Sequence, residues 1–230
     1  DKALNTDANN PLVYGERSQI YLAKNDVDRA LADLDRAIEL GTISPAPYRA
    51  RAKIYESKGD TARAIDDLNE AIRLDPRPAA VYFERAGLRQ ANGETAHVLT
   101  DLNDGLARNP DNVTALMTRA QIKDDRGDIS GAIADYGAVL KHNPKNVAAL
   151  NAHAMALMQT KDYAKAADDF DHIIALDPKN AQVYYQRGLA REQIQQFDRA
   201  MADFKLALAR DRNLDDARLE VFDAGWRHEN

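Results

Sequence analysis

Proline recurs at a constant interval along this chain, and that interval constrains the possible fold more than any other feature of the sequence. Pro76, Pro110, Pro144 and Pro178 are each 34 residues apart, and each follows Asp or Asn. A fixed period of this length indicates a stack of repeated supersecondary units. Extended in both directions, the period gives six units without an insertion, at residues 11–44, 45–78, 79–112, 113–146, 147–180 and 181–214.

Each unit has the pattern of a helical hairpin. Gly59, Gly93 and Gly127 lie near the middle of their units, where a glycine in the left-handed conformation can end a helix. In the second half of a unit, apolar residues recur at intervals of three and four, as in residues 64–72, until a stop such as LDP ends the helix. No segment alternates with a period of two between turn residues. The sequence therefore predicts an all-α chain of antiparallel helix pairs.

Four places within the unit hold the same kind of side chain throughout the chain. The fourth place is aromatic or Leu, the eighth is small, the twentieth is Ala or Val, and the twenty-fourth is large and apolar. In that order, the residues are Tyr14, Tyr48, Tyr82, Leu116, Leu150 and Tyr184; Ser18, Ala52, Ala86, Ala120, Ala154 and Gly188; Ala30, Ala64, Val98, Ala132, Ala166 and Ala200; and Leu34, Leu68, Leu102, Tyr136, Phe170 and Phe204. This pattern resembles the tetratricopeptide repeat family over nearly the whole chain. The resemblance implies a right-handed superhelical solenoid whose first helices line a concave groove.

The chain departs from the family pattern at two kinds of place. Thr42 and Arg212 stand where the family has its Pro, and the eleventh place holds Arg89, Lys123 and Arg191 instead of an apolar residue. We expect these residues to weaken local helix endings or packing without changing the fold class.

The seventh place of each unit should face the core, yet it holds a basic residue, and every unit has Asp sixteen residues later. The pairs are Arg17 and Asp33, Arg51 and Asp67, Arg85 and Asp101, Arg119 and Asp135, His153 and Asp169, and Arg187 and Asp203. Residues equidistant from the turn of an antiparallel hairpin lie opposite one another, so the spacing predicts a ladder of ion pairs within the units. A basic ladder for an anionic partner is the alternative. The matching Asp in every unit favours charges that are already neutralised.

Composition excludes several classes of function. Lys and Arg total 31 against 37 Asp and Glu, so the net charge of −6 disfavours nucleic acid as a partner. No apolar run approaches the roughly 18 residues that span a bilayer, so we expect no membrane insertion. The chain has no Cys, which rules out a disulfide framework and a thiolate zinc site and leaves a cytoplasmic or a periplasmic location open.

No constellation of residues with catalytic or metal-binding chemistry is apparent. The five His residues include no pair at i, i+4 spacing, and residues 127–137 have glycines but no Lys-Ser or Lys-Thr for a phosphate loop. Neighbouring carboxylates such as Asp168 and Asp169 diverge by about 100° on a helix. We therefore predict a protein that is not an enzyme and that uses no cofactor or metal.

The two ends of the chain carry expectations of their own. Residues 1–10 align with the end of a unit, since DKAL coincides with DRAI at residues 35–38. They are predicted to be the remnant of a preceding repeat's second helix, which would make the chain a fragment of a longer array or a multidomain protein. Residues 215–230 are predicted to form a capping helix and tail, with a polar outer side that keeps a terminal unit soluble.

The resemblance places the functional side chains on the first helix of each unit, at the places that face the groove. The predicted peptide-binding residues are Arg49, Lys53, Phe83, Met117, Gln121, Asn151, Met155, Met158, Tyr185, Gln186 and Leu189. Met117, Met155 and Met158 could accept apolar anchors because Met repacks easily, or could instead fill gaps between repeats.

These observations lead to one functional hypothesis and two alternatives. The hypothesis is a non-catalytic scaffold that binds a peptide or protein segment in its concave groove. The first alternative is a regulatory or targeting arm of a larger multidomain enzyme. The second is a module that forms a homo-oligomer through its terminal helices, including Phe222 and Trp226.

Overall fold

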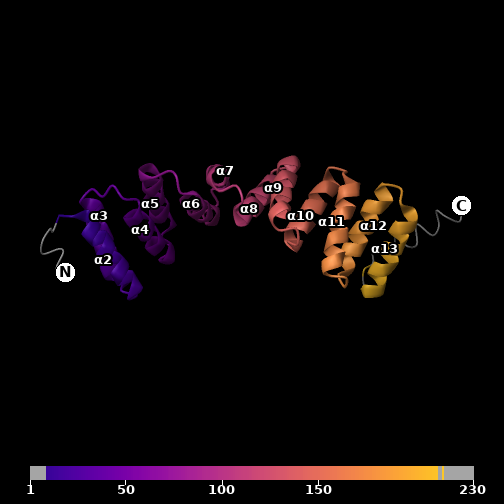
Figure 1. The fold of residues 1–230 in the computed structure, drawn as a ribbon, viewed down its shortest axis with the longest axis horizontal. Coiled ribbons are helices and arrows are strands. Elements are labelled where there is room, and N and C mark those ends of the chain that lie inside the picture. The colour runs from indigo at the N-terminus through magenta and orange to yellow at the C-terminus, as the bar shows by residue number, and fades with distance from the viewer. Residues whose placement is uncertain (1–8, 212–213, 215–230) are drawn as a thin grey trace. The chain divides into compact units, whose positions relative to one another are not determined.

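The computed structural model describes residues 9–211 and Leu214. Over these residues the chain forms twelve α-helices and no β-strand (Figure 1). The helices are α2 (Pro11–Ala23), α3 (Val27–Glu39), α4 (Ala46–Ser57), α5 (Thr61–Leu74), α6 (Ala79–Ala91), α7 (Thr95–Arg108), α8 (Val113–Asp125), α9 (Ile129–His142), α10 (Val147–Gln159), α11 (Tyr163–Leu176), α12 (Ala181–Gln193) and α13 (Phe197–Arg210). They pack in consecutive pairs, so the predicted all-α fold of helical hairpins is confirmed. We call α2, α4, α6, α8, α10 and α12 the first helices.

Acidic and amide side chains cap many of these helices. Asp26, Asp60 and Asp128 each accept the backbone N–H of the third residue beyond them, at the starts of α3, α5 and α9. Asn112 and Asn146 do the same for α8 and α10. Such caps satisfy backbone donors that have no partner inside the helix, and they fix where each helix begins.

The turn inside each hairpin contains a residue with positive φ. Gly59, Gly93 and Gly127 have φ values of 76°, 78° and 81°, as expected for helix-ending glycines. Non-glycine residues occupy this conformation in the other three hairpins, at Asn25, Lys161 and Gln195. The turn geometry is therefore the same in all six hairpins, although the glycine signal marks only half of them.

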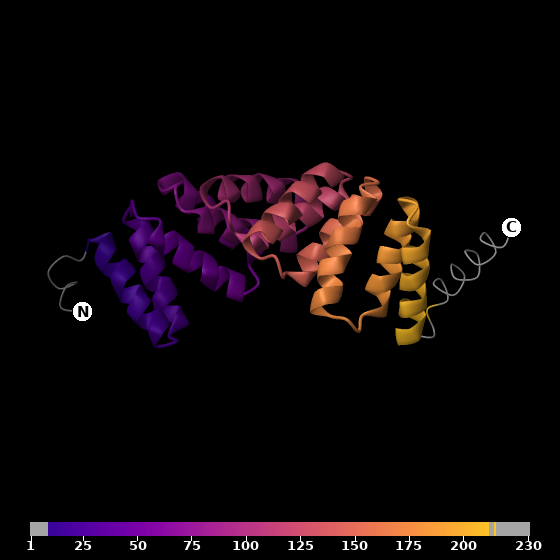
Figure 2. The same ribbon diagram turned by 45° about the vertical axis from the view of Figure 1, so that its right-hand side comes forward.

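The chain divides into two compact units, one ending at Pro110 and the other beginning at Asp111. The N-terminal unit contains α2 to α7, and the C-terminal unit contains α8 to α13. Figure 2 shows the hairpins of each unit from a second direction. Each unit buries a core of its own, around Leu34, Leu68 and Val81 in the first and around Phe170 and Tyr136 in the second.

Two expectations fall outside the part of the chain that the structure describes. The predicted helix remnant lies within residues 1–8 except for its last two positions, and the predicted capping helix lies at residues 215–230. The twelve described helices correspond to about six repeats, and the boundaries assigned to each repeat remain a prediction. None of the helices in the described ranges is both long and apolar enough to cross a membrane.

Candidate functional site

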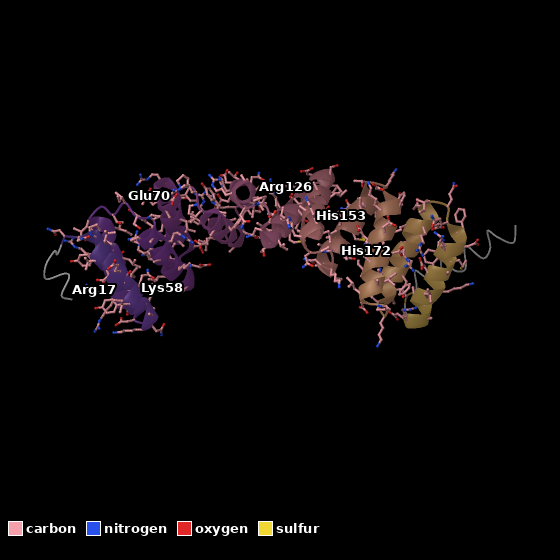
Figure 3. The ribbon with its side chains drawn as sticks, viewed as in Figure 1. Arg17, Lys58, Glu70, Arg126, His153 and His172 are labelled. Atoms are coloured by element: carbon pink, nitrogen blue, oxygen red, sulfur yellow. The ribbon has the colours of Figure 1, made fainter. Side chains whose placement is uncertain are left out.

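The predicted ladder is present, with an Arg–Asp ion pair in five hairpins and a His–Asp contact in the fifth hairpin along the chain. Arg17 donates from Nε and Nη2 to the two carboxylate oxygens of Asp33, at 2.7 and 2.6 Å. The same bidentate contact, with the Asp on the second helix of the same hairpin, is made by Arg51, Arg85, Arg119 and Arg187. In the fifth hairpin, His153 Nδ1 lies 2.6 Å from Asp169 Oδ2. Figure 3 labels Arg17 and His153, the first and fifth members of the ladder.

Several ladder arginines also bind the preceding hairpin, which the sequence reasoning did not anticipate. Arg51 Nη1 donates to Asp35 at 2.7 Å, and Arg85 Nη1 donates to Asn69 at 2.7 Å. Arg187 Nη1 makes the same bond to Asp171 at 2.5 Å. Each acceptor lies sixteen residues before its Arg, as far as the Asp partner lies after it. A polar residue at that distance was the signal that could have identified these bonds.

The fifth hairpin is the exception to this arrangement. Its ladder residue is His153, and the position sixteen residues earlier is Gly137. A Cβ atom added to Gly137 would lie 3.8 Å from His153 Nε2, so the two residues are neighbours across the junction between α9 and α10. At this junction an imidazole therefore stands in place of the guanidinium, and a residue without a side chain stands in place of its polar acceptor.

The basic residues at the eleventh place of three units bind the ladder Asp residues, contrary to our expectation. We expected them to weaken packing, but each donates to the Asp that the ladder residue already binds. The bonds are Arg89 to Asp101 at 2.8 Å, Lys123 to Asp135 at 2.9 Å and Arg191 to Asp203 at 2.8 Å. In these hairpins one buried carboxylate therefore holds two cations, which offsets the cost of placing a charge at an apolar position.

The titration of Asp135 reflects this arrangement. Burial alone would raise the pKa of Asp135, but hydrogen bonds from Arg119 and Lys123 outweigh it, and the pKa lies below its ordinary value. Arg187 is in a similar balance, because burial lowers its pKa while bonds to Asp203 and Asp171 raise it above its ordinary value. The ladder charges thus neutralise one another inside the hairpins, and the alternative of a basic ladder for an anionic partner loses its support.

The residues predicted to bind a peptide differ in their exposure. Lys53 on α4, Gln121 on α8, and Asn151 and Met155 on α10 are exposed. Gln121 donates to Asp125 one turn along its own helix at 2.9 Å. Gln186 and Leu189, both on α12, are half-buried.

Four of the predicted apolar contacts pack against their neighbours. The Phe83 ring occupies the space over Gly105 on α7, where an added Cβ would come within 2.3 Å of it. Tyr185 lies against Phe204 with ring centroids 5.9 Å apart. Met117 packs on the cluster around Ala132 and Tyr136, and Met158 packs on the cluster around Leu157 and Phe170. These side chains contribute to the core, whatever their part in binding.

Neighbouring first helices are joined by polar contacts on the predicted binding face. Arg49 on α4 donates to both carboxylate oxygens of Glu84 on α6, at 3.3 and 2.7 Å. In the C-terminal unit, Gln159 on α10 donates to Asp124 on α8 at 3.4 Å. Both pairs are 35 residues apart, which is one repeat plus one residue. This offset shows how adjacent first helices align within a unit.

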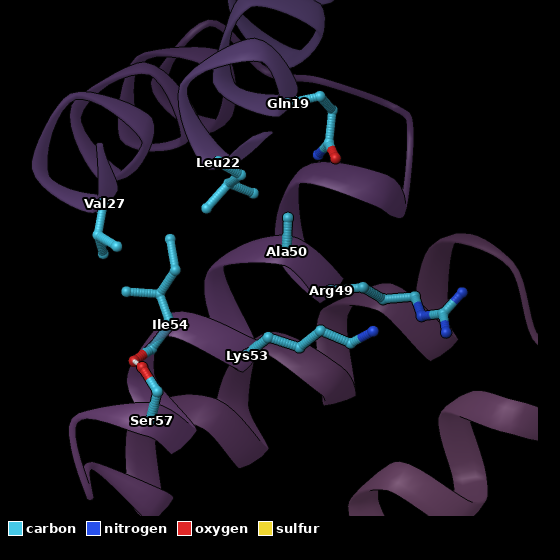
Figure 4. Close-up of a pocket in the computed structure, with 8 residues that line it drawn as sticks. All are labelled: Gln19, Leu22, Val27, Arg49, Ala50, Lys53, Ile54 and Ser57. Carbon is cyan, nitrogen blue, oxygen red and sulfur yellow. Dashed lines mark hydrogen bonds between the residues drawn. The ribbon is translucent and has the colours of Figure 1, made fainter. Parts of the chain in front are cut away.

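A pocket of about 450 Å³ lies between α2 and α4 in the N-terminal unit (Figure 4). It is lined by Gln19, Leu22, Val27, Arg49, Ala50, Lys53, Ile54 and Ser57. Two of the predicted peptide-binding residues, Arg49 and Lys53, are therefore brought together at one cavity. The other six lining residues were not predicted. Ala50, a small residue at a groove-facing place, is one of them.

Within the described residues, no group of three or more His, Asp or Glu side chains is arranged to hold a metal ion. The exposed side chains and the pocket on the first helices offer apolar surface, amides and cations.

Comparisons with known proteins identify the repeat. A tetratricopeptide repeat family model matches residues 16–77 and 117–181, and a second tetratricopeptide repeat model matches residues 181–214. No curated protein matches the sequence.

Solved structures match the fold at low sequence identity. YrrB, described as a TPR protein with an unusual peptide-binding site, is 17% identical over 80% of this chain and 95% of its own, with a TM-score of 0.66. A tetratricopeptide repeat protein from Parabacteroides merdae ATCC 43184 is 20% identical over 93% of this chain and 98% of its own, with a TM-score of 0.60. A chain of the Naa15/Naa10 structure bound to HypK-THB is 16% identical over 97% of this chain and 35% of its own, with a TM-score of 0.69.

Proposed function

Because this chain belongs to the tetratricopeptide repeat family, we propose that it is a non-catalytic scaffold that binds a peptide or protein segment in a concave groove, on the face formed by its first helices. Two similar folds support this role, one in a protein described as having a peptide-binding site and one in a multi-protein structure. Function in a repeat fold depends on the side chains that the scaffold presents.

The distribution of exposed side chains carries the proposal. The ladder charges are paired inside the hairpins, so they are not offered to a partner. Lys53 remains exposed on α4 in the N-terminal unit. In the C-terminal unit, Gln121, Asn151 and Met155 remain exposed on α8 and α10 and present two amides and a flexible apolar side chain. This mixture suits a segment held by a few apolar anchors and hydrogen bonds.

Selection from a random peptide library tests the proposal. Peptides that bind the wild-type chain should lose binding to a variant with Lys53→Ala, Gln121→Ala and Met155→Ala. They should keep binding to a control variant with Asp66→Ala, Lys141→Ala and His172→Ala, which changes exposed residues of second helices. Both variants should keep the wild-type melting temperature. Binding that depends on the control positions, or no selected peptide at all, would refute the proposal.

Self-association through the terminal hairpins is a second candidate, because large apolar side chains are exposed at both ends of the described chain. Leu12 and Ile20 on α2 are 60% and 55% exposed, and Phe197 and Leu206 on α13 are 49% and 39% exposed. A heterologous contact between the two ends would join copies head to tail. Solution mass over a dilution series tests this candidate, and a monomer at every concentration excludes it.

A further inference from the structure

We propose that the pocket between α2 and α4 binds a peptide segment in which an aliphatic side chain and a carboxylate lie close together in sequence. This inference rests on the proposed function and names the chemistry of one binding site within it. The segment belongs to a partner protein. The reasons are the form of the pocket floor, the placement of its cations and the absence of a carboxylate from its lining.

The floor of the pocket is apolar and held in place by the core. Ile54 is buried, and Leu22, Val27 and Ala50 pack against the same cluster, around Ala30 and Leu34. Figure 4 shows Leu22, Val27 and Ile54 facing one another at one end of the cavity. Because these side chains are fixed by packing, an aliphatic group can fill the cavity without reorganising it. The volume of about 450 Å³ lies in the range of small-ligand sites.

The opposite end of the pocket is cationic. Figure 4 shows the Arg49 and Lys53 side chains extending in the same direction, away from the apolar end. Arg49 is half-buried and bound to Glu84. Lys53 is exposed, and its ammonium group has no hydrogen-bond or ion-pair partner among the described residues. Lys53 is thus the group that can take a carboxylate from a partner.

The lining of the pocket contains two cations and no carboxylate, in a chain whose net charge is −6. Glu56 and Glu84 line a separate recess of about 60 Å³, which they share with Lys53. Charge complementarity therefore favours an acidic group at the Lys53 end of the larger pocket, and the nearby glutamates disfavour a partner with several acids. An aliphatic group and one carboxylate match the two ends of the cavity.

Fluorescence anisotropy with designed peptides tests the proposal. The probes are labelled glycine-serine peptides that carry one leucine and one glutamate at varied spacing, with counterparts in which glutamine replaces the glutamate or serine replaces the leucine. The wild-type chain should bind the leucine-glutamate probe at one spacing about tenfold more tightly than either counterpart. Added salt should weaken that binding, because an exposed charge pair is screened.

Three variants locate the site. Lys53→Glu should weaken the leucine-glutamate probe about tenfold or more, whereas the matched charge reversal Lys205→Glu, on an exposed position of α13, should leave it unchanged. Glu84→Gln should strengthen binding several-fold. The substitution removes the carboxylate that binds Arg49, so that Arg49 can bind the glutamate of the probe instead. Equal binding of the glutamate and glutamine probes, or full binding to Lys53→Glu, would overturn the proposal.

Other occupants give different results. Equal binding of the leucine and serine probes would show an anion-binding surface alone and would overturn the aliphatic part of the proposal. A solution mass that grows with concentration and falls in Lys53→Glu would show a second copy of this chain in the pocket, and would overturn a partner segment. If library-selected peptides require Gln121 and Met155 but ignore Lys53, this pocket assignment fails while the proposed function stands.

Discussion

Single residues in this chain are matched to the volume and charge of the residue they face. Phe83 and Gly105 form such a pair across α6 and α7, and Phe204 and Gly188 form another across α12 and α13. In each case an aromatic ring fills the space that a Cβ would need. A glycine in the middle of a helix is normally a weakness, so its position here reflects packing.

Substitution of these glycines should separate packing from helix propensity. Gly87→Ala on α6 meets nothing within 4 Å and should stabilise the chain by about 0.5–1 kcal/mol. Gly105→Ala should destabilise it by about 1–3 kcal/mol, because the added Cβ would lie 2.3 Å from the Phe83 ring. Chemical denaturation measures both. Stabilisation by Gly105→Ala would show that Phe83 moves aside freely.

Asp135 should make stability depend on pH. Its folded-state pKa lies below its ordinary value of 3.8, so its contribution is fully present above pH 3.8 and is lost as the pH falls through the lowered pKa. At neutral pH, Asp135→Asn should cost about 1–3 kcal/mol, because Arg119 and Lys123 lose a charged acceptor. That difference from the wild type should shrink below pH 3.8.

Asp66→Asn is the matched control for this measurement, since Asp66 is an exposed carboxylate on a second helix. Its effect on the free energy of unfolding should be small throughout the titration. A difference between wild type and Asp135→Asn that stays constant into the acid range would contradict the ion-pair account of Asp135.

At the scale of the helical elements, hairpins are joined by arginines that bind on both sides. Arg51 binds Asp67 in its own hairpin and Asp35 in the preceding one, and Arg187 binds Asp203 and Asp171 in the same way. The junction of α9 and α10 has His153 and Gly137 at these positions. It is therefore joined by apolar packing with a weaker polar contribution.

Restoring the missing pair should stabilise that junction. His153→Arg alone should cost stability or leave it unchanged, because the third arm of the guanidinium would face Gly137. The double variant Gly137→Asp/His153→Arg should have a higher free energy of unfolding than the sum of the two single effects predicts, with a coupling energy of about 1 kcal/mol. A double-mutant cycle in denaturant measures this coupling. A coupling energy near zero would mean that residues 137 and 153 do not interact across the junction of α9 and α10.

At the scale of the whole molecule, stability should be local. The apolar clusters around Leu34 and Leu68 lie entirely within the unit that ends at Pro110, and those around Tyr136 and Phe170 lie entirely within the unit that begins at Asp111. The stability of a repeat protein is approximately the sum of the stabilities of its repeats and of the interfaces between neighbouring repeats.

Each unit should therefore fold when produced alone. Residues 1–110 and residues 111–230 should each give a helical circular dichroism spectrum and a cooperative thermal transition. Their melting temperatures should lie at or below that of the whole chain, because shorter arrays have fewer neighbouring contacts. A half that remains unfolded at low temperature would show that its core depends on the other half.

Much of this architecture could be predicted from the sequence because the 34-residue period repeats each physical requirement several times. The helix pairs and the ladder from Arg17 to Arg187 followed from spacing alone. The partners of Arg49 and of Arg89 did not, because they depend on how neighbouring helices align and on side chains long enough to reach a buried Asp. The pocket between α2 and α4 was also missed, since a cavity depends on the gap left by small residues such as Ala50.

The two-sided arginines have a consequence for how such arrays can be lengthened by duplication. A copied hairpin brings its own Arg and Asp, but the outer acceptor of that Arg belongs to whatever hairpin it is inserted behind. An insertion behind a hairpin like the fourth, which offers Gly137, would leave one arm of the incoming guanidinium without its ligand. A duplicated segment therefore keeps both acceptors of its Arg only if it begins within one second helix and ends within the next second helix.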